Sequence, residues 1–242
     1  MSGHSKWHNI QGKKGKADKA RSNIFTKVSR AITMAAKQGG DPVTNFTLRL
    51  AIDSAKEVNM PKDNIERAIK RGLGELDDGS QIEEVTYEGF GPGGVAFIVE
   101  TVTDNKNRTV SEIKNIFSKH GGSLGSPNSV RWQFERHGVV RFVAEKKAKI
   151  ADLDNFSLEL LDVGVEDVRE SEDGVEVISS VENFVTVVGK IKAVGIEPDT
   201  AGIEWVAKEK IETDESLSEK VSAFYDLLDE QDDVNNIFTN EA

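Results

Sequence analysis

Cysteine is absent from this chain of 242 residues, which excludes a disulfide framework, a thiolate nucleophile and cysteine metal ligands. No run of apolar residues approaches the roughly 20 that a membrane-spanning helix needs. The basic residues at the N-terminus are not followed by the apolar core of a secretory signal. These absences predict a cytoplasmic protein that makes no contact with a membrane.

Sequence signatures of catalysis are also missing. Gly89, Gly91 and Gly94 have the spacing of a dinucleotide-binding turn, but the residues after them favour a strand where that site needs a helix. No phosphate-binding G-K-[ST] follows, and no serine lies at a strand-to-helix elbow. His4 and His8 have no third metal ligand nearby. We therefore expect no enzyme, no cofactor, no metal and no small-molecule substrate.

Charge is divided unevenly along the chain. Residues 1–73 hold 15 basic and 6 acidic side chains, a net charge of +9, so the remainder of a chain with net charge −11 carries −20. Solubility alone does not require such a division. It predicts that the N-terminal part contacts a polyanion and that the rest does not.

Hydrophobic periodicity predicts an α+β fold. Three helices are expected within residues 22–72, the second beginning with Asp41 as its N-cap and the third opening at Pro61. Residues 85–134 then have the order β-β-α-β, with a strand at 130–134, and residues 139–207 have the ferredoxin-like order β-α-β-β-α-β.

A last helix and strand, within residues 217–238, complete the count of the 85–134 unit. We predict an N-terminal three-helix bundle followed by two ferredoxin-like α+β domains, the second inserted into the first. The alternative is a C-terminal hairpin packed elsewhere. The predicted boundaries are a basic flexible arm at 1–21, a helical bundle at 22–73, a middle α+β domain at 82–136 plus 209–242, and an inserted ferredoxin-like domain at 137–208.

The basic residues are candidates for binding nucleic acid, because lysine and arginine neutralise phosphates without any demand for sequence. Trp7 adds an aromatic plane on which an unpaired base can stack. The alternatives are a solubilising tail at the N-terminus and a helix-capping loop at residues 104–109. The candidate residues are Lys6, Trp7, Lys13, Lys14, Lys16, Lys19, Arg21, Lys27, Arg30, Lys62, Arg67, Lys70, Arg71, Lys106 and Arg108.

Several segments resemble the YebC family. They are Ser2-Gly3-His4-Ser5-Lys6-Trp7, Ile24-Phe25-Thr26-Lys27, Asn59-Met60-Pro61-Lys62, Ile65-Glu66-Arg67-Ala68-Ile69, Tyr87-Glu88-Gly89-Phe90-Gly91-Pro92-Gly93-Gly94, Asp104-Asn105-Lys106-Asn107-Arg108-Thr109 and Phe117-Ser118-Lys119-His120-Gly121-Gly122. The resemblance covers most of residues 2–134, and beyond them only the pattern of elements matches.

The resemblance implies a three-domain cytoplasmic protein that regulates transcription by binding DNA. It also implies a role in translation, because relatives include the mitochondrial translational activator of cytochrome oxidase, and bacterial members are linked to relief of ribosome stalling at proline runs. The partner would then be promoter DNA, or ribosomal or transfer RNA with the ribosome itself. An enzyme that uses a cleft between the ferredoxin-like domains is a third hypothesis. A flexible lysine-rich arm with one tryptophan favours RNA on physical grounds.

Overall fold

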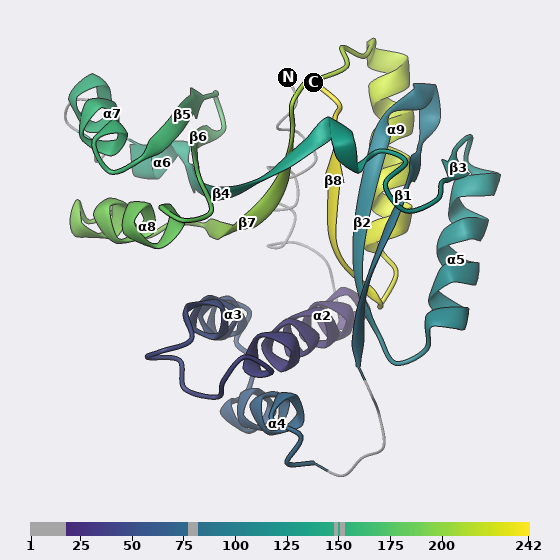
Figure 1. Cartoon of the computed structure of the whole chain (residues 1–242), viewed down its shortest axis with the longest axis horizontal. Helices are drawn as coiled ribbons and strands as arrows, with labels where there is room; N and C mark the ends of the chain where they lie inside the picture. The colour runs from purple at the N-terminus through teal and green to yellow at the C-terminus, as the bar shows by residue number, and fades with distance from the viewer. Residues whose placement is uncertain (1–17, 77–81, 148–149, 151–152) are drawn as a thin grey trace. The chain divides into compact units, whose positions relative to one another are not determined.

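The computed structural model describes residues 18–76, 82–147, 150 and 153–242, without the side chains of residues 18–23 and 153–154 (Figure 1). Contacts within the chain divide it into two compact units. The first holds residues 1–133 and 207–242, and the second holds residues 134–206. No helix among the described residues is long and apolar enough to cross a bilayer.

Three helices form the N-terminal part of the first unit: α2 Asp18–Ala36, α3 Phe46–Glu57 and α4 Lys62–Gly72. Their apolar residues recur every three or four positions, so each helix buries one face. The buried residues are Ile32, Ala35, Ala36, Leu48, Ala55, Met60, Ile65 and Ala68. Gly72 allows α4 to approach α2 closely, because a Cβ atom there would lie 2.3 Å from the carbonyl oxygen of Thr33.

Helix α3 begins later than predicted. Asp41 does not cap it: residues 42–44 form a turn and the N-cap is Asn45, whose side chain accepts a hydrogen bond from the Leu48 amide at 3.0 Å. The Asn45 amide group also donates to the carbonyls of Ala35, at 2.8 Å, and Gly39, at 2.7 Å. The Asn45 side chain thus bonds backbone groups at and after the end of α2 and at the start of α3. These bonds set the beginning of α3 at Phe46.

A four-stranded antiparallel sheet forms the rest of the first unit, with strand order β3-β1-β2-β8. Its strands are β1 Glu83–Phe90, β2 Ala96–Thr103, β3 Ser123–Leu124 and β8 Val234–Thr239, and its helices are α5 Lys106–Lys119 and α9 Glu215–Asp229. The short 3-10 helix η1 Pro92–Gly94 turns the chain between β1 and β2.

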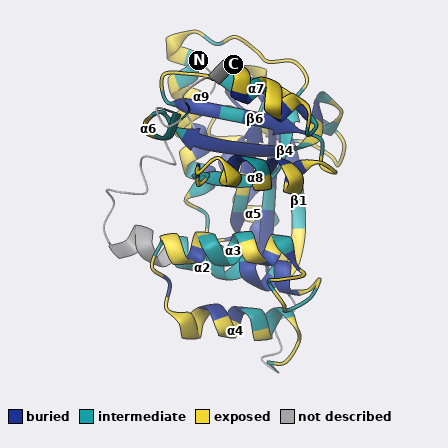
Figure 2. Cartoon of the chain, turned by 90° about the vertical axis from the view of Figure 1, so that its left-hand side faces the viewer, coloured by how far each residue is buried: buried dark blue, intermediate teal, exposed yellow. Residues whose placement is uncertain are grey.

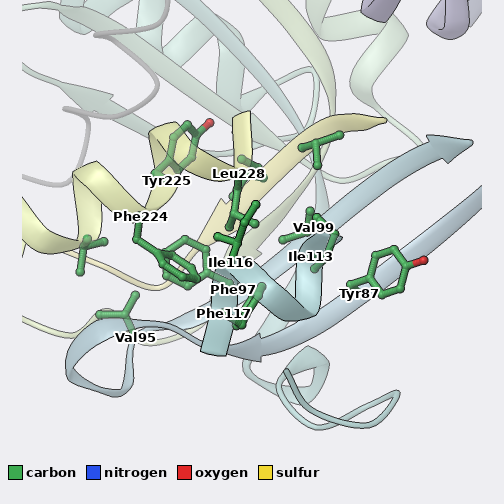
Figure 3. Close-up of a cluster of buried hydrophobic side chains, with 13 residues drawn as sticks. Tyr87, Val95, Phe97, Val99, Ile113, Ile116, Phe117, Phe224, Tyr225 and Leu228 are labelled. Carbon is green, nitrogen blue, oxygen red and sulfur yellow. The ribbon is translucent and has the colours of Figure 1, made fainter. Parts of the chain in front are cut away.

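Three phenylalanines form the centre of this unit's core (Figure 3). Phe97 of β2, Phe117 of α5 and Phe224 of α9 pack edge to face, with ring centroids 4.9, 5.0 and 6.4 Å apart. Alternate residues of β2 and the inner faces of both helices therefore share one cluster. Edge-to-face packing is favourable because the edge of an aromatic ring is partly positive and its face is partly negative.

The second unit is a four-stranded antiparallel sheet with helices. Its elements are β4 Phe134–Val143, α6 Ala144–Lys147, α7 Leu153–Leu161, β5 Val165–Glu170, β6 Gly174–Ser179, α8 Phe184–Ala193 and β7 Thr200–Ala207. The strand order β5-β6-β4-β7 is that of a ferredoxin-like sheet. Arg141, buried on β4, binds Glu176 at 2.7 Å and Glu204 at 2.8 Å, so its charge is neutralised within the sheet. The predicted α+β fold class is confirmed.

The predicted strand at 130–134 is wrong. Residues Arg131–Gln133 form the 3-10 helix η2, and β4 begins only at Phe134. The strand is prevented by Glu88 of β1. Its buried carboxylate accepts hydrogen bonds from the backbone amides of Val130, at 3.2 Å, and Arg131, at 3.0 Å. Amides that donate to a carboxylate are not available to a sheet ladder.

The described elements also bear on the predicted boundaries, which remain predictions. Helix α2 begins at Asp18, four residues before the expected start of the bundle at residue 22. The second unit occupies residues 134–206, whereas the inserted domain was predicted at 137–208. Residues 1–17, which make up most of the predicted arm, lie outside the described residues.

Replacing Phe117 with alanine should destabilise the first unit by about 3–5 kcal/mol, because it leaves a cavity among three buried rings. Phe90, at the end of β1, is the matched control because it is 36% exposed, and Phe90→Ala should cost roughly 1 kcal/mol. Urea unfolding monitored by circular dichroism measures both changes. Equal losses in the two variants would contradict the packing described here.

Candidate nucleic-acid interface

Helix α4 presents predicted nucleic-acid-binding residues at its surface. Lys62, Arg67 and Lys70 are exposed and Arg71 is half-buried, while Ile65 and Ala68 on the opposite side pack into the bundle. Positions three and four apart share one face of a helix, so Arg67, Lys70 and Arg71 lie together. In Figure 2 most of the α4 ribbon is coloured as exposed or partly exposed.

The acidic residues of α4 do not neutralise this face. Lys62 pairs with Glu66 at 3.5 Å, but the two side chains are 86% and 53% exposed, so water screens the pair. Asp63 lies in the first turn of α4, and Lys70 and Arg71 lie in the last turn. These charges interact favourably with the helix dipole and so stabilise the helix. The arrangement therefore serves helix stability and leaves a cationic surface that can bind phosphates.

Two predicted residues of α2 have partners within the protein. The Lys27 ammonium binds the carboxylate of Asp229 at 2.8 Å and donates to its carbonyl oxygen. Arg30 donates to the carbonyl oxygen of Asp232 and pairs with the carboxylate of Asp233 at 2.8 Å. Both cationic side chains are less than one-fifth exposed, so they join α2 to the turn between α9 and β8.

The carboxylate of Asp233 is the centre of a buried polar network. It accepts hydrogen bonds from the hydroxyls of Thr109, at 2.6 Å, and Thr103, at 3.0 Å, and from the Arg108 guanidinium at 2.9 Å. Burial raises the pKa of Asp233, but the hydrogen bonds from Thr109 and Arg108, with the charge of Arg30, outweigh burial and hold that pKa below its ordinary value. The carboxylate is therefore ionised and fully bonded.

The segment 104–109 caps a helix, which was the predicted alternative to nucleic-acid binding. Asn105 is the N-cap of α5 and accepts a hydrogen bond from the Arg108 amide at 3.1 Å. Arg108 also pairs with Asp104 at 3.0 Å, and Lys106 pairs with Glu83 of β1. Both cations are paired with protein carboxylates. A phosphate that bound here would therefore compete with these ion pairs.

The remaining candidates are those nearest the N-terminus. Lys6, Trp7, Lys13, Lys14 and Lys16 lie outside the described residues. Lys19 and Arg21 belong to the first turn of α2, and their side chains are also outside the description. Among the candidates whose side chains are described, Arg67, Lys70 and Arg71 lie together on α4, and Arg30 and Arg108 meet at Asp233. Lys27 pairs with Asp229 and Lys106 with Glu83.

Comparisons with known proteins identify the family. The model of the TACO1/YebC protein N-terminal domain matches residues 5–75, and that of the TACO1/YebC second and third domain matches residues 82–241. The chain belongs to the TACO1/YebC family. The resemblance to YebC proteins is therefore confirmed over both the helical and the α+β parts of the chain.

Curated relatives share the whole length of the chain. A probable transcriptional regulatory protein of Fusobacterium nucleatum is 47% identical over 99% of this chain and 95% of its own. One from Thermotoga maritima, with the same descriptive name, is 43% identical over 99% of this chain and 93% of its own. The crystal structure of a conserved hypothetical protein from Aquifex aeolicus has a TM-score of 0.83 and 39% identity, covering 94% of this chain and 92% of that one.

Replacing Asp233 with asparagine should destabilise the protein by about 1–3 kcal/mol at pH 7, because it weakens the bonds from two threonines and removes the charge that faces Arg108 and Arg30. Asp104→Asn is the matched control. It removes a carboxylate that also binds Arg108 but is 49% exposed, and it should cost less than about 1 kcal/mol.

The same pair of variants tests the pH dependence of stability. Since the pKa of Asp233 in the folded protein lies below the value of about 3.9 expected when unfolded, its stabilisation is complete above that pH and is lost as the pH falls through the folded pKa. Urea unfolding between pH 7 and pH 3 should show this loss in the wild type and in Asp104→Asn. A profile of the same slope in Asp233→Asn would contradict the role of the carboxylate.

Proposed function

We propose that this protein is a nucleic-acid-binding regulator of gene expression that acts without catalysis, through its basic N-terminal arm and the cationic face of α4. The observation that carries the proposal is the exposure of Lys62, Arg67 and Lys70 on α4, in the same N-terminal part as the basic run of residues 6–21. Relatives named as probable transcriptional regulatory proteins support a role in regulation.

The candidate nucleic-acid-binding cations fall into two groups in this proposal. Lys27, Arg30, Lys106 and Arg108 already bind protein carboxylates, so a phosphate would have to displace an existing ion pair. The exposed cations of α4 are screened only by water and by weak surface pairs. We therefore assign phosphate contacts to α4 and to the arm, and a positioning role to the four paired residues.

RNA is the ligand that we favour, in a role in translation. A lysine-rich arm with one tryptophan suits the backbone and the unpaired bases of folded RNA better than the major groove of a duplex. The acidic remainder of the chain, which carries −20, would repel phosphates elsewhere and so orient the protein on a large RNA.

Duplex DNA is the second candidate, and one observation favours it. Helices α3 and α4 are joined by only four residues, 58–61, which is the connection length of a helix-turn-helix. In that arrangement α4 would be the recognition helix, with Asn64 and Arg67 exposed near its N-terminal end. Base reading would then come from α4, and the arm would bind the backbone.

The double variant Arg67→Gln/Lys70→Gln should flatten the salt dependence of nucleic-acid binding. Each lost phosphate contact lowers the slope of log K against log salt by about 0.9 on duplex DNA and about 0.7 on single strands. The matched control is Lys114→Gln/Lys220→Gln, which removes the same charge from exposed positions on α5 and α9. Fluorescence anisotropy titrations at roughly 50 to 300 mM salt measure the affinity of both variants, and the slope of log K against log salt is compared. Equal slopes in the two variants would contradict the assignment to α4.

Crosslinking the intact protein to nucleic acid in cells, followed by sequencing, distinguishes the two ligands. We expect ribosomal or transfer RNA to be enriched over a control without crosslinking. Enrichment of discrete promoter sequences would select the DNA candidate instead. Recovery of no nucleic acid above the control would overturn the proposed function.

A further inference from the structure

Trp132 is the most exposed aromatic side chain among the described residues, with 69% of its surface accessible. It lies in η2 of the first unit, in the segment that was predicted as a strand. Its neighbours in η2, Arg131 and Gln133, are polar. The exposed ring offers a ligand an accessible aromatic plane.

The backbone that carries Trp132 is held in place by a buried charge. The Glu88 carboxylate, whose side chain is 1% exposed, accepts the amides of Asn128 at 3.0 Å, Val130 at 3.2 Å and Arg131 at 3.0 Å. It also pairs with the Arg131 guanidinium at 3.0 Å. The neighbouring Val130 is fully buried, which anchors the loop in the core. Hydrogen bonds to a charged group are stronger than neutral ones, so these contacts hold the loop 128–131 in one conformation.

The indole ring is itself fixed by a hydrogen bond. Its Nε1–H donates to the carbonyl oxygen of Ser129 at 3.2 Å. The only polar atom of the ring is therefore satisfied within the loop, and the accessible part of the side chain is its aromatic surface. A ligand that binds this surface meets a side chain whose conformation is already restricted, which lowers the entropy lost on binding.

Two lysines lie on a segment beside Trp132. The carbonyl oxygen of the next residue, Gln133, accepts a hydrogen bond from the Lys208 amide at 2.9 Å. The segment 208–210 thus runs beside the loop, with exposed Lys208 and Lys210 on either side of Glu209. The charge of Arg131, which precedes Trp132, is paired with that of Glu88. An aromatic plane among cations is the arrangement that single-strand nucleic-acid sites use.

We propose that Trp132 is a stacking site for an unpaired nucleic-acid base. The proposal rests on the proposed function and narrows its ligand to nucleic acid that contains unpaired bases. The base stacks on the exposed indole face, and the adjacent phosphates lie near Lys208 and Lys210. Trp132 thereby adds a contact in the α+β part of the first unit to those of the arm and α4.

Three substitutions at Trp132 separate stacking from other roles. The probes are a single-stranded 12-nucleotide RNA and the blunt RNA duplex of the same sequence. Trp132→Ala and Trp132→Leu should each weaken binding of the single strand by roughly 5- to 150-fold, and Trp132→Phe should retain most of the affinity, because only an aromatic ring stacks. Binding of the duplex should change by less than about twofold in all three, since its bases are already stacked.

Fluorescence reports on the ring directly. The chain has three tryptophans, so Trp7→Phe/Trp205→Phe leaves Trp132 alone, and Trp7→Phe/Trp132→Phe leaves Trp205, which lies half-buried beneath the Arg136 guanidinium. The single strand should quench the emission of the first variant and not that of the second. Quenching of neither variant, or of both equally, would overturn the proposal.

The outcomes distinguish this inference from the function on which it rests. If the wild type binds neither of these probes nor duplex DNA of the same sequence at any salt concentration tested, the proposed function fails. If it binds the single strand and Trp132→Ala binds equally well, nucleic-acid binding stands and the stacking site is overturned. Full affinity in Trp132→Leu together with a loss in Trp132→Ala would show an apolar contact in place of stacking, and would also overturn it. Circular dichroism of each variant verifies that the fold is retained.

Discussion

The buried carboxylate of Asp233 is the interaction on which the first unit depends. It joins the end of β2 through Thr103, the first turn of α5 through Arg108 and Thr109, and helix α2 through Arg30, at the point where β8 begins. Three regions far apart in sequence, at Arg30, at residues 103–109 and at Asp233 itself, therefore share one charge. Because a buried carboxylate is costly unless every partner is present, the network stabilises this one arrangement over others in which α2 or β8 packs differently.

The same network divides the basic residues of the N-terminal part by role. Lys27 and Arg30 of α2 bind acidic residues and carbonyl oxygens of the α9–β8 turn, while Lys62, Arg67 and Lys70 of α4 are exposed. Charge in the sequence is thus a poor guide to charge at the surface. The net charge of +9 in residues 1–73 overstates what is available to a polyanion, because Lys27 and Arg30 are paired within the protein.

The fold was predictable where the signals are local, and it was missed where they are not. Hydrophobic spacing placed the start of α4 within one residue, and strand patterns gave the ferredoxin-like order of elements in the second unit. The strand expected at 130–134 failed because the Glu88 carboxylate, more than 40 positions earlier, takes two of its amides. The exposed cations of α4 follow from helical spacing alone. The pairing of Lys27 with Asp229 and the exposure of Trp132 depend on tertiary contacts that no short motif records.

The partners of α2 come from the end of the chain, 202 residues after the helix itself. At synthesis rates of about 5–20 residues per second, α2 emerges from the ribosome roughly 10 to 40 s before the turn that neutralises it. During that interval the acidic residues that pair with Lys27 and Arg30 have not yet been made, and neither has β8, the last strand of the first sheet. The net charge of the nascent chain is therefore more positive at this stage than that of the finished protein.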